Sequence, residues 1–339
     1  MTIVFSRRTA LLATGLGALG AAGAPARASA RTSAGPSARP SVVHGSAPAL
    51  HPEGVTWDPA RGAFLVGSVR HGTISVVRWD GTVRTLVDDG VMVSTLAVHV
   101  DPVRGRVLAT YQDPGVGTRS SGATMYRQSG LGVFDLATGA VLHRVDLSAV
   151  PGSAAGVHGA NDFALDTSGN AYVTDIVSGE IHRVDPAAGR ATLLLGRPDL
   201  LGRDGVGPNG VVWHPGGFLL VVRYDTGALL RIPVHAPGRI SEVRLDEPVV
   251  GGDGLALRPD GSLAVVINRL ASTATPGVAI LRSEDNWSSA RTVTRSAPWP
   301  DPDPTTAVAT AHGTYVIEGR LAGLFAGTLD DTFTIRALP

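Results

Sequence analysis

The sequence predicts an all-β protein, a six-bladed β-propeller with four-stranded antiparallel blades, preceded by a cleavable signal peptide. A short apolar motif recurs at about the interval that one propeller blade requires. Runs rich in Val, Ile, Leu and Thr alternate with Gly, Pro and Asp turns, which is a strand signal. No stretch beyond the N-terminal segment keeps a 3.6-residue apolar period, so no substantial helix is expected.

Residues 1–30 are expected to be a twin-arginine signal peptide. Arg7 and Arg8 precede an apolar run at residues 10–24, and small residues around Ala28 and Ala30 fit a signal-peptidase site. The run is shorter than the ~20 residues that span a bilayer, so no stable membrane insertion is expected after cleavage. The segment predicts a secreted or extracytoplasmic protein of bacterial source.

Residues 31–48 are rich in Ser, Pro, Ala and Arg without periodicity, and we interpret them as a disordered linker. Residues 49–339 form the predicted propeller. Residues 41–50 are a candidate for pairing with the last blade to close the ring, a point that the sequence leaves open.

Composition excludes several kinds of chemistry. The 339 residues contain 29 basic and 29 acidic side chains, and every basic one is Arg because the chain has neither Lys nor Cys. A net charge of zero argues against a nucleic-acid surface. Lysine Schiff bases, cysteine nucleophiles, thiolate zinc sites and disulfides are all impossible.

The blade repeat is recognised by a polar residue, a small residue, an alternating apolar stretch and a turn. Its six copies begin at Glu53, Leu96, Asn161, Asn209, Asp253 and Thr306. The intervals are 43, 65, 48, 44 and 53 residues, and four of them lie near the ~40–50 residues expected for one blade. The long interval contains the polar, Gly-rich residues 112–130, interpreted as an insertion. A seven-bladed ring that uses this insertion is the alternative.

The remaining strands of each period follow in order. After Asn161 the expected strands are residues 171–174, 179–184 and 191–195. After Asn209 they are residues 218–222, 228–232 and 240–244, each bounded by Gly-containing or other turn sequences.

The first strand of each blade lines the channel of a propeller, so residues at one repeat position form a ring. Four of the six carry oxygen donors: Glu53, Asn161, Asn209 and Asp253. Two carboxylates and two amide carbonyls suit Ca²⁺, with Zn²⁺ or Mg²⁺ as alternatives. Asn or Asp before Gly is also an ordinary turn former, and this remains the competing interpretation.

At these residues the sequence resembles the senescence-marker/gluconolactonase family, which is related to the paraoxonase and diisopropyl-fluorophosphatase propellers. The matching motifs are Pro52-Glu53-Gly54, Asn161-Asp162, Pro208-Asn209-Gly210 and Asp253-Gly254. The resemblance implies hydrolysis of a lactone, ester or phosphotriester at one channel metal. It also implies that Glu53, Asn209 and Asp253 are ligands, with Asn161 a ligand or a substrate-orienting residue. Sugar-lactone members carry Arg where this chain has Gly159, and paraoxonase-like members carry Asn where it has Gly254.

For this chain we therefore expect an exported, metal-dependent hydrolase of a lactone or ester. The metal polarises the carbonyl, and Asp253 acts as base or nucleophile. His158, in a Gly-rich loop, is a candidate proton shuttle, and His51 a weaker one. Asp162 is expected to point to the opposite face of its strand and to secure the turn.

Two alternatives remain: a non-catalytic binding propeller with a structural ion, and a propeller recruited to a non-hydrolytic reaction in secondary metabolism. In each case the expected partner is a small molecule or a bound polymer rather than nucleic acid, and the protein is expected to be a monomer.

Overall fold

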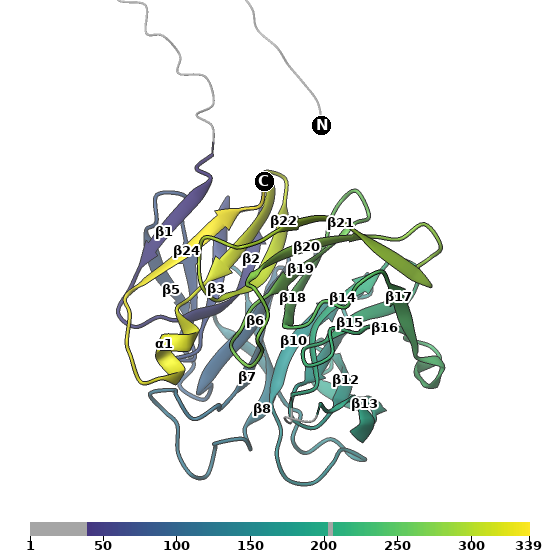
Figure 1. Ribbon diagram of the computed structural model, residues 1–339. Coiled ribbons are helices and arrows are strands. Elements are labelled where there is room, and N and C mark those ends of the chain that lie inside the picture. Colours follow the sequence, from purple (N-terminus) through teal and green to yellow (C-terminus); the bar gives the residue numbers. More distant parts are fainter. Residues whose placement is uncertain (1–38, 203–205) are drawn as a thin grey trace, which may run out of the picture. The chain divides into compact units, whose positions relative to one another are not determined.

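The computed structural model describes residues 39–202 and 206–339. The predicted signal peptide at residues 1–30 lies outside the described residues. The described chain is all-β, as predicted, and forms a propeller of four four-stranded antiparallel sheets and one eight-stranded sheet (Figure 1).

Three sheets follow the chain in simple order. The first contains β2 (Pro52–Asp58), β3 (Ala63–Ser68), β4 (Ile74–Val77) and β5 (Val83–Val87). The second contains β6 (Ser94–Asp101), β7 (Arg106–Gln112), β8 (Ser129–Asp135) and β9 (Val141–Asp146). The third contains β10 (Ala160–Leu165), β11 (Ala171–Asp175), β12 (Glu180–Asp185) and β13 (Arg190–Gly196).

The next eight strands form one sheet of two antiparallel halves. One half contains β14 (Pro208–His214), β15 (Phe218–Arg223), β16 (Leu229–Pro233) and β17 (Ser241–Leu245). The other contains β18 (Gly252–Leu257), β19 (Leu263–Ile267), β20 (Gly277–Arg282) and β21 (Ser289–Ser296). The outer strands β17 and β21 join the halves through a short parallel pairing.

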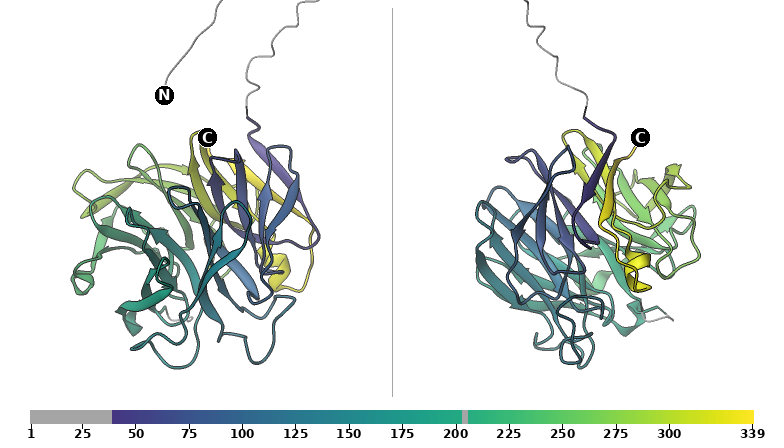
Figure 2. Two further views of the ribbon diagram at one scale, coloured as in Figure 1. Left: turned by 180° about the vertical axis from the view of Figure 1, so that it is seen from behind. Right: turned by 90° about the vertical axis from the view of Figure 1, so that its left-hand side faces the viewer.

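The last sheet is closed by the N-terminal strand. It contains β22 (Pro304–Thr310), β23 (Gly313–Glu318), β24 (Thr332–Ala337) and β1 (Val42–Ser46). β1 pairs antiparallel with β24, and the two lie side by side in every view (Figures 1 and 2). The closing strand that the sequence left open for residues 41–50 is thus formed by residues 42–46. The linker expected at residues 31–48 is wrong for these five residues, and its residues 31–38 lie outside the described residues.

Helical structure in the described residues is limited to short turns. They are the 3₁₀ turns η1 (Pro198–Leu200) and η2 (Pro237–Arg239) and the helix α1 (Leu321–Phe325), which lies between β23 and β24. The insertion between β7 and β8 contains turns and bends but no strand, so it adds no sheet of its own. Within the described residues no helix has the length and apolar character needed to cross a membrane.

The first strands of the sheets form a closed ring. β2 packs beside β6, β6 beside β10, and so on through β14, β18 and β22, which packs back against β2. A channel therefore runs between β2, β6, β10, β14, β18 and β22, and residues at one register position face one another across it.

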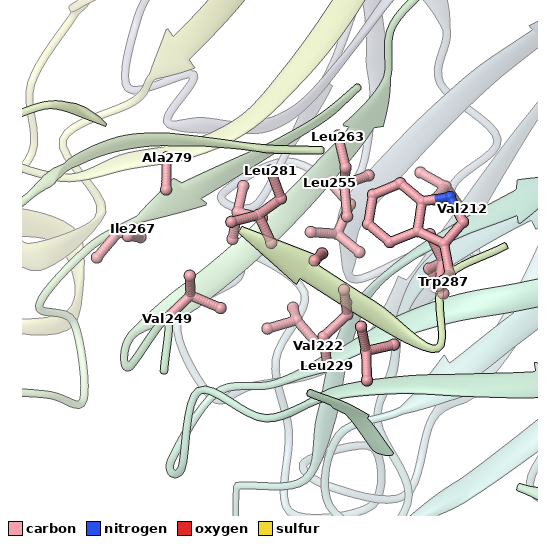
Figure 3. Close-up of a cluster of buried hydrophobic side chains, with 14 of the residues drawn as sticks. Val212, Val222, Leu229, Val249, Leu255, Leu263, Ile267, Ala279, Leu281 and Trp287 are labelled. Atoms are coloured by element: carbon pink, nitrogen blue, oxygen red, sulfur yellow. The ribbon is translucent and has the colours of Figure 1, made fainter. Parts of the chain in front are cut away.

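The core lies between neighbouring sheets. Inner strands such as β15 and β19 are buried on both faces, which explains their continuous apolar sequences, whereas the outer strand β9 is mostly exposed. One buried cluster includes Leu229 of β16, Leu281 of β20 and Trp287, so it joins the two halves of the eight-stranded sheet (Figure 3). Burial of this kind contributes ~25 cal/mol per Å² of apolar surface.

Candidate functional site

Every strand of the ring carries a β-bulge at the same height. The register with the second strand shifts at two consecutive residues: 53–54, 96–97, 161–162, 209–210, 253–254 and 305–306. A bulge adds an unpaired residue and redirects side chains that regular alternation would send elsewhere. The repeated bulge therefore brings two successive residues of each strand to the channel.

The first bulge residues form the predicted ring with one correction. They are Glu53, Leu96, Asn161, Asn209, Asp253 and Thr305. Thr306, the predicted sixth member, is the second residue of its bulge, since Pro304 pairs with Glu318 and Ala307 with Val316. Because Thr305 and Thr306 are adjacent and of the same type, the sequence does not show which of them is the first bulge residue. The Thr305 hydroxyl donates to the carbonyl oxygen of Glu53 at 2.6 Å.

The structure brings the four predicted oxygen-bearing residues together. Glu53, Asn161, Asn209 and Asp253 all line both of two cavities along the channel, a narrow one of about 20 Å³ and a wider one of about 180 Å³. Their side chains are buried. Asn161 Nδ2 donates to Asn209 Oδ1 at 2.5 Å, which joins two neighbouring strands of the ring. The four residues thus separate the two cavities.

Burial dominates the electrostatics of the two carboxyl groups. It raises the pKa of Glu53 well above its usual range, and the nearby charges of Asp253 and Asp162 raise it further. Burial also raises the pKa of Asp253 to about 7, although hydrogen bonds from Asn268 and Asn209 oppose the shift. No cationic side chain contributes to either pKa shift. A positive charge bound between the two carboxyl groups would stabilise their anionic forms.

The donor set fits a hard divalent cation. Carboxylate and amide oxygens are the ligands that Ca²⁺ prefers, and Asn161 and Asn209 add neutral oxygen atoms to the two carboxylates. In residues 39–202 and 206–339 no group of three or more His, Cys, Asp or Glu side chains is arranged to hold a metal. An ion at the channel therefore depends on the two amides as well as on Glu53 and Asp253.

Asp162 is expected from the sequence to secure a turn and to face away from the channel, but it lies in the bulge of β10 and does not turn away from the channel. Its Oδ1 accepts from the Phe163 N–H at 2.8 Å and its Oδ2 from the Val211 N–H at 3.0 Å, which ties β10 to β14. It borders the narrow cavity, because the bulge suspends the alternation of faces on which the opposite expectation rested.

His158 lies in a separate buried cluster. Its Nδ1 is 3.4 Å from Asp175 Oδ2 and 3.9 Å from Glu180 Oε2. The nearby Asp175 carboxylate raises the pKa of His158, while burial lowers the pKa of His182 beside it. His158 is absent from the lining of both channel cavities, so its position gives no support to the proton-shuttle prediction.

His51 also has a structural environment. Its Nδ1 lies 2.9 Å from the carbonyl oxygen of Gly319, and its Nε2 accepts from the N–H of Asp330 at 3.1 Å. These contacts connect the start of β2 to both ends of the β23–β24 connection. Both ring nitrogens of His51 are thus engaged by backbone groups.

Asn268 is a site residue that the sequence analysis missed. It is fully buried, and its Nδ2 donates to Asp253 Oδ2 at 2.5 Å and to the carbonyl oxygen of Pro304 at 3.0 Å. Its Oδ1 accepts from the Tyr224 hydroxyl at 2.7 Å. The available signal was an Asn directly after the apolar strand at residues 263–267, at the end where the channel ring lies.

Comparisons with solved structures show the same fold. The chain is similar to the allergen Mala s 1 of Malassezia sympodialis, with a TM-score of 0.68 and 18% identity, covering 88% of this chain and 96% of that one. It is similar to a gluconolactonase from Xanthomonas campestris, with a TM-score of 0.56 and 16% identity, covering 85% and 86%. A virginiamycin B lyase from Staphylococcus aureus gives 0.55 and 13%, covering 88% and 99%.

Comparisons with protein-family models and with curated protein sequences give no match. The structural neighbours include gluconolactonase-like proteins, as the sequence motifs predict. At these identities the likeness establishes the β-propeller fold.

Proposed function

We propose that this protein is an exported, divalent-metal-dependent hydrolase of a lactone or ester, with Ca²⁺ as the expected ion. The observation that carries the proposal is the convergence of Glu53, Asn161, Asn209 and Asp253 on one level of the channel, at the base of an apolar cavity. The similarity to a gluconolactonase supports the same class of reaction.

The four residues would hold the ion through their side-chain oxygens. A bound divalent ion supplies Lewis-acid polarisation of the substrate carbonyl and compensates the buried negative charge. Asn268 fixes the orientation of the Asp253 carboxylate through the hydrogen bond to Oδ2. Residue positions are thus set before substrate enters, which is the arrangement that electrostatic catalysis requires.

Asp253 is the proposed acid–base group, and direct attack by its carboxylate is the alternative route. In the first route Asp253 takes a proton from water while the water oxygen bonds to the acyl carbon. The carbon–oxygen ester bond then breaks, and the proton passes to the departing alkoxide oxygen. The net reaction adds one water and opens the lactone or ester.

The proposal has four further parts, which concern the blade count, the substrate, the oligomeric state and export. We count six blades, taking each half of the eight-stranded sheet as one blade. The substrate is a small molecule, the protein acts as a monomer, and export follows the twin-arginine signal expected at residues 1–30. His158 is retained only as part of the cluster with Asp175.

Metal analysis of the purified protein tests the proposal. Wild type is expected to retain about one divalent ion per chain, Asn209→Ala much less, and Asn170→Ala as much as wild type. Asn170 is the matched control because its side chain bonds only to Asp166 in a surface turn. Equal and negligible metal in wild type and Asn209→Ala would refute the metal site.

Activity distinguishes the proposed function from its alternatives. Turnover of a panel of lactones and esters is expected to disappear on chelation and in Asp253→Ala. A tightly bound ion with no turnover on any member of the panel would contradict hydrolysis. It would favour a non-hydrolytic reaction, or a structural ion if chelation only lowered the melting temperature.

A further inference from the structure

The wider cavity has apolar walls above a polar base. Connections between the second and third strands of several sheets contribute side chains to the walls: Pro114, Ile176, Leu270, Leu321 and Phe325. Leu96 of the channel ring adds another apolar surface. No arginine or histidine lies among the described residues that line this cavity. The described part of the lining therefore offers no positive charge to a substrate carboxylate or phosphate.

Most polar groups on the walls are already engaged within the protein. The Tyr224 hydroxyl donates to Asn268 Oδ1 at 2.7 Å and accepts from the Ala271 N–H at 2.9 Å. The Thr305 hydroxyl donates to the Glu53 carbonyl oxygen. A substrate hydroxyl pointing at Tyr224 or Thr305 would lose its hydrogen bonds to water and meet hydroxyl hydrogens that are already donated, which is unfavourable. Among the described wall residues the Gln112 amide is the group that could replace such a bond.

The space beside Gly159 is filled by the side chain of Gln112. A Cβ atom at this position would lie 2.5 Å from Oε1 of Gln112 and 3.3 Å from Val177. Gln112 therefore occupies the space into which a longer side chain at residue 159 would project. The cavity has an amide here instead of the guanidinium that the resemblance associates with sugar lactones.

The helix α1 forms an anchored apolar wall. Leu321 and Leu324 are buried and pack against Val69 and Leu96, which fixes the helix on the channel rim. Phe325, at its C-terminal end, lines the cavity while 51% of its surface remains exposed. Phe325 therefore offers apolar surface to a ligand in the cavity.

We propose that this cavity selects a compact apolar lactone or ester without further hydroxyl groups, and that Phe325 on α1 is a specificity-determining residue for it. The inference rests on the proposed function, because that function requires a substrate with a reacting carbonyl group. The preference for an apolar substrate rests on the residues of the cavity walls. The volume of about 180 Å³ is below the ~300–1,000 Å³ of pockets for drug-sized ligands, so the favoured substrates are small.

A pair of lactams tests binding without turnover. One is a δ-lactam with a short alkyl chain, and the other is the polyhydroxylated δ-lactam of gluconic acid; their amides mimic the lactone carbonyl but resist hydrolysis. Binding is measured by ligand-observed NMR with the calcium-loaded protein. The alkyl lactam is expected to bind at least about tenfold more tightly, because each unpaired hydroxyl of the other weakens binding.

Two variants test whether Phe325 causes the preference for the alkyl lactam. Phe325→Ala is expected to weaken alkyl-lactam binding roughly fivefold and to leave the gluconic lactam unchanged. Leu329→Ala is the control, since Leu329 lies in the same β23–β24 connection and is 54% exposed but does not line the cavity. Melting temperatures of both variants check that the fold is intact.

The outcomes separate this inference from the proposed function. Tighter binding of the gluconic lactam, or equal loss in Phe325→Ala and Leu329→Ala, would overturn the inference even if lactones are hydrolysed. Selective binding of the alkyl lactam without hydrolysis of the corresponding lactone would overturn the proposed function and leave the cavity assignment intact. Hydrolysis of alkyl lactones in preference to glucono-δ-lactone would support both.

Discussion

Glu318 is a fully buried carboxyl group at the end of β23 that takes no part in the channel ring. Its Oε1 accepts from the Arg320 N–H at 2.9 Å, and its Oε2 has no hydrogen-bond partner among the described residues. Burial raises the pKa of Glu318 to about 7, despite the nearby Arg320 guanidinium. The folded protein therefore keeps this acid protonated up to a higher pH than the unfolded chain does.

This preference predicts a pH-dependent stability that Glu318→Gln reduces. Between its usual pKa of 4.5 and about 7, the folded state retains the proton that the unfolded chain releases, so stability falls as pH rises across this interval. In Glu318→Gln we expect the decrease in unfolding free energy between pH 4.5 and 7 to be smaller by on the order of 1–2 kcal/mol. Chemical unfolding at pH 4.5 and 7 with a chelator present measures it.

Glu242→Gln on β17 is the control, because this glutamate is exposed. An unchanged slope in Glu318→Gln would mean that Glu318 ionises freely in the folded protein. The raised pKa values of Glu53 and Asp253 act in the same direction, so part of the slope is expected to remain in the variant and to decrease when metal is added.

Asn268 is expected to act as a positioning residue for Asp253. Removing its amide in Asn268→Ala leaves Asp253 Oδ2 without its donor, and loss of such outer contacts typically weakens metal affinity or activity ~10–100-fold. Tyr224→Phe removes only the hydroxyl that holds Asn268 and should weaken metal affinity in the same direction but less. Calcium titration of both variants measures the effect, and wild-type affinity in Asn268→Ala would contradict it.

The four oxygen donors could be predicted from the sequence, whereas parts of their surroundings could not. A polar residue before a small one at a regular interval identified Glu53, Asn161, Asn209 and Asp253. The same pattern placed the sixth position at Thr306 instead of Thr305, because a bulge register depends on pairing with β23. Asn268 contacts Asp253 from just beyond β19, and its place directly after an apolar strand does not reveal that contact.

At the scale of the strand, three of the six bulges have glycine as their second residue, at points where neighbouring ring strands meet closely. A Cβ at Gly210 would lie 2.1 Å from the carbonyl oxygen of Asp253, and a Cβ at Gly54 would lie 2.4 Å from that of Leu96. Backbone atoms cannot move aside as a flexible side chain can. These glycines therefore set the distance between successive ring strands, and with it the spacing of the oxygen donors.

Gly210→Ala is expected to damage both stability and the site. The methyl group must displace the backbone of β18 at Asp253, so we expect unfolding free energy to fall by about 2 kcal/mol or more and metal content to drop. Gly238→Ala is the control, because a Cβ there meets open space. Equal stability and equal metal content in the two variants would show that the ring strands tolerate the added atom.

At the scale of the whole domain, the ring is closed by pairing its two ends. β1 begins the described strands and completes the sheet of β22, β23 and β24, which ends them. Val43 is buried beside Phe333 and Ile335. The backbone bonds from Ala337 N–H to Ser41 oxygen and from Ala47 N–H to Asp331 oxygen extend the pairing beyond β1. Loss of β1 exposes β24 as an unpaired edge.

A chain that begins at residue 49 is therefore expected to melt more than about 10 °C below one that begins at residue 39, and to aggregate more readily on heating. Within the longer chain, Val43→Asp should reproduce much of the loss, because it places a charge in the core. His44→Asp should not, because His44 is exposed on the opposite face of β1. Calorimetry of the four proteins measures the effect. Equal melting temperatures for the two chain lengths would mean that β22, β23 and β24 close the ring without β1.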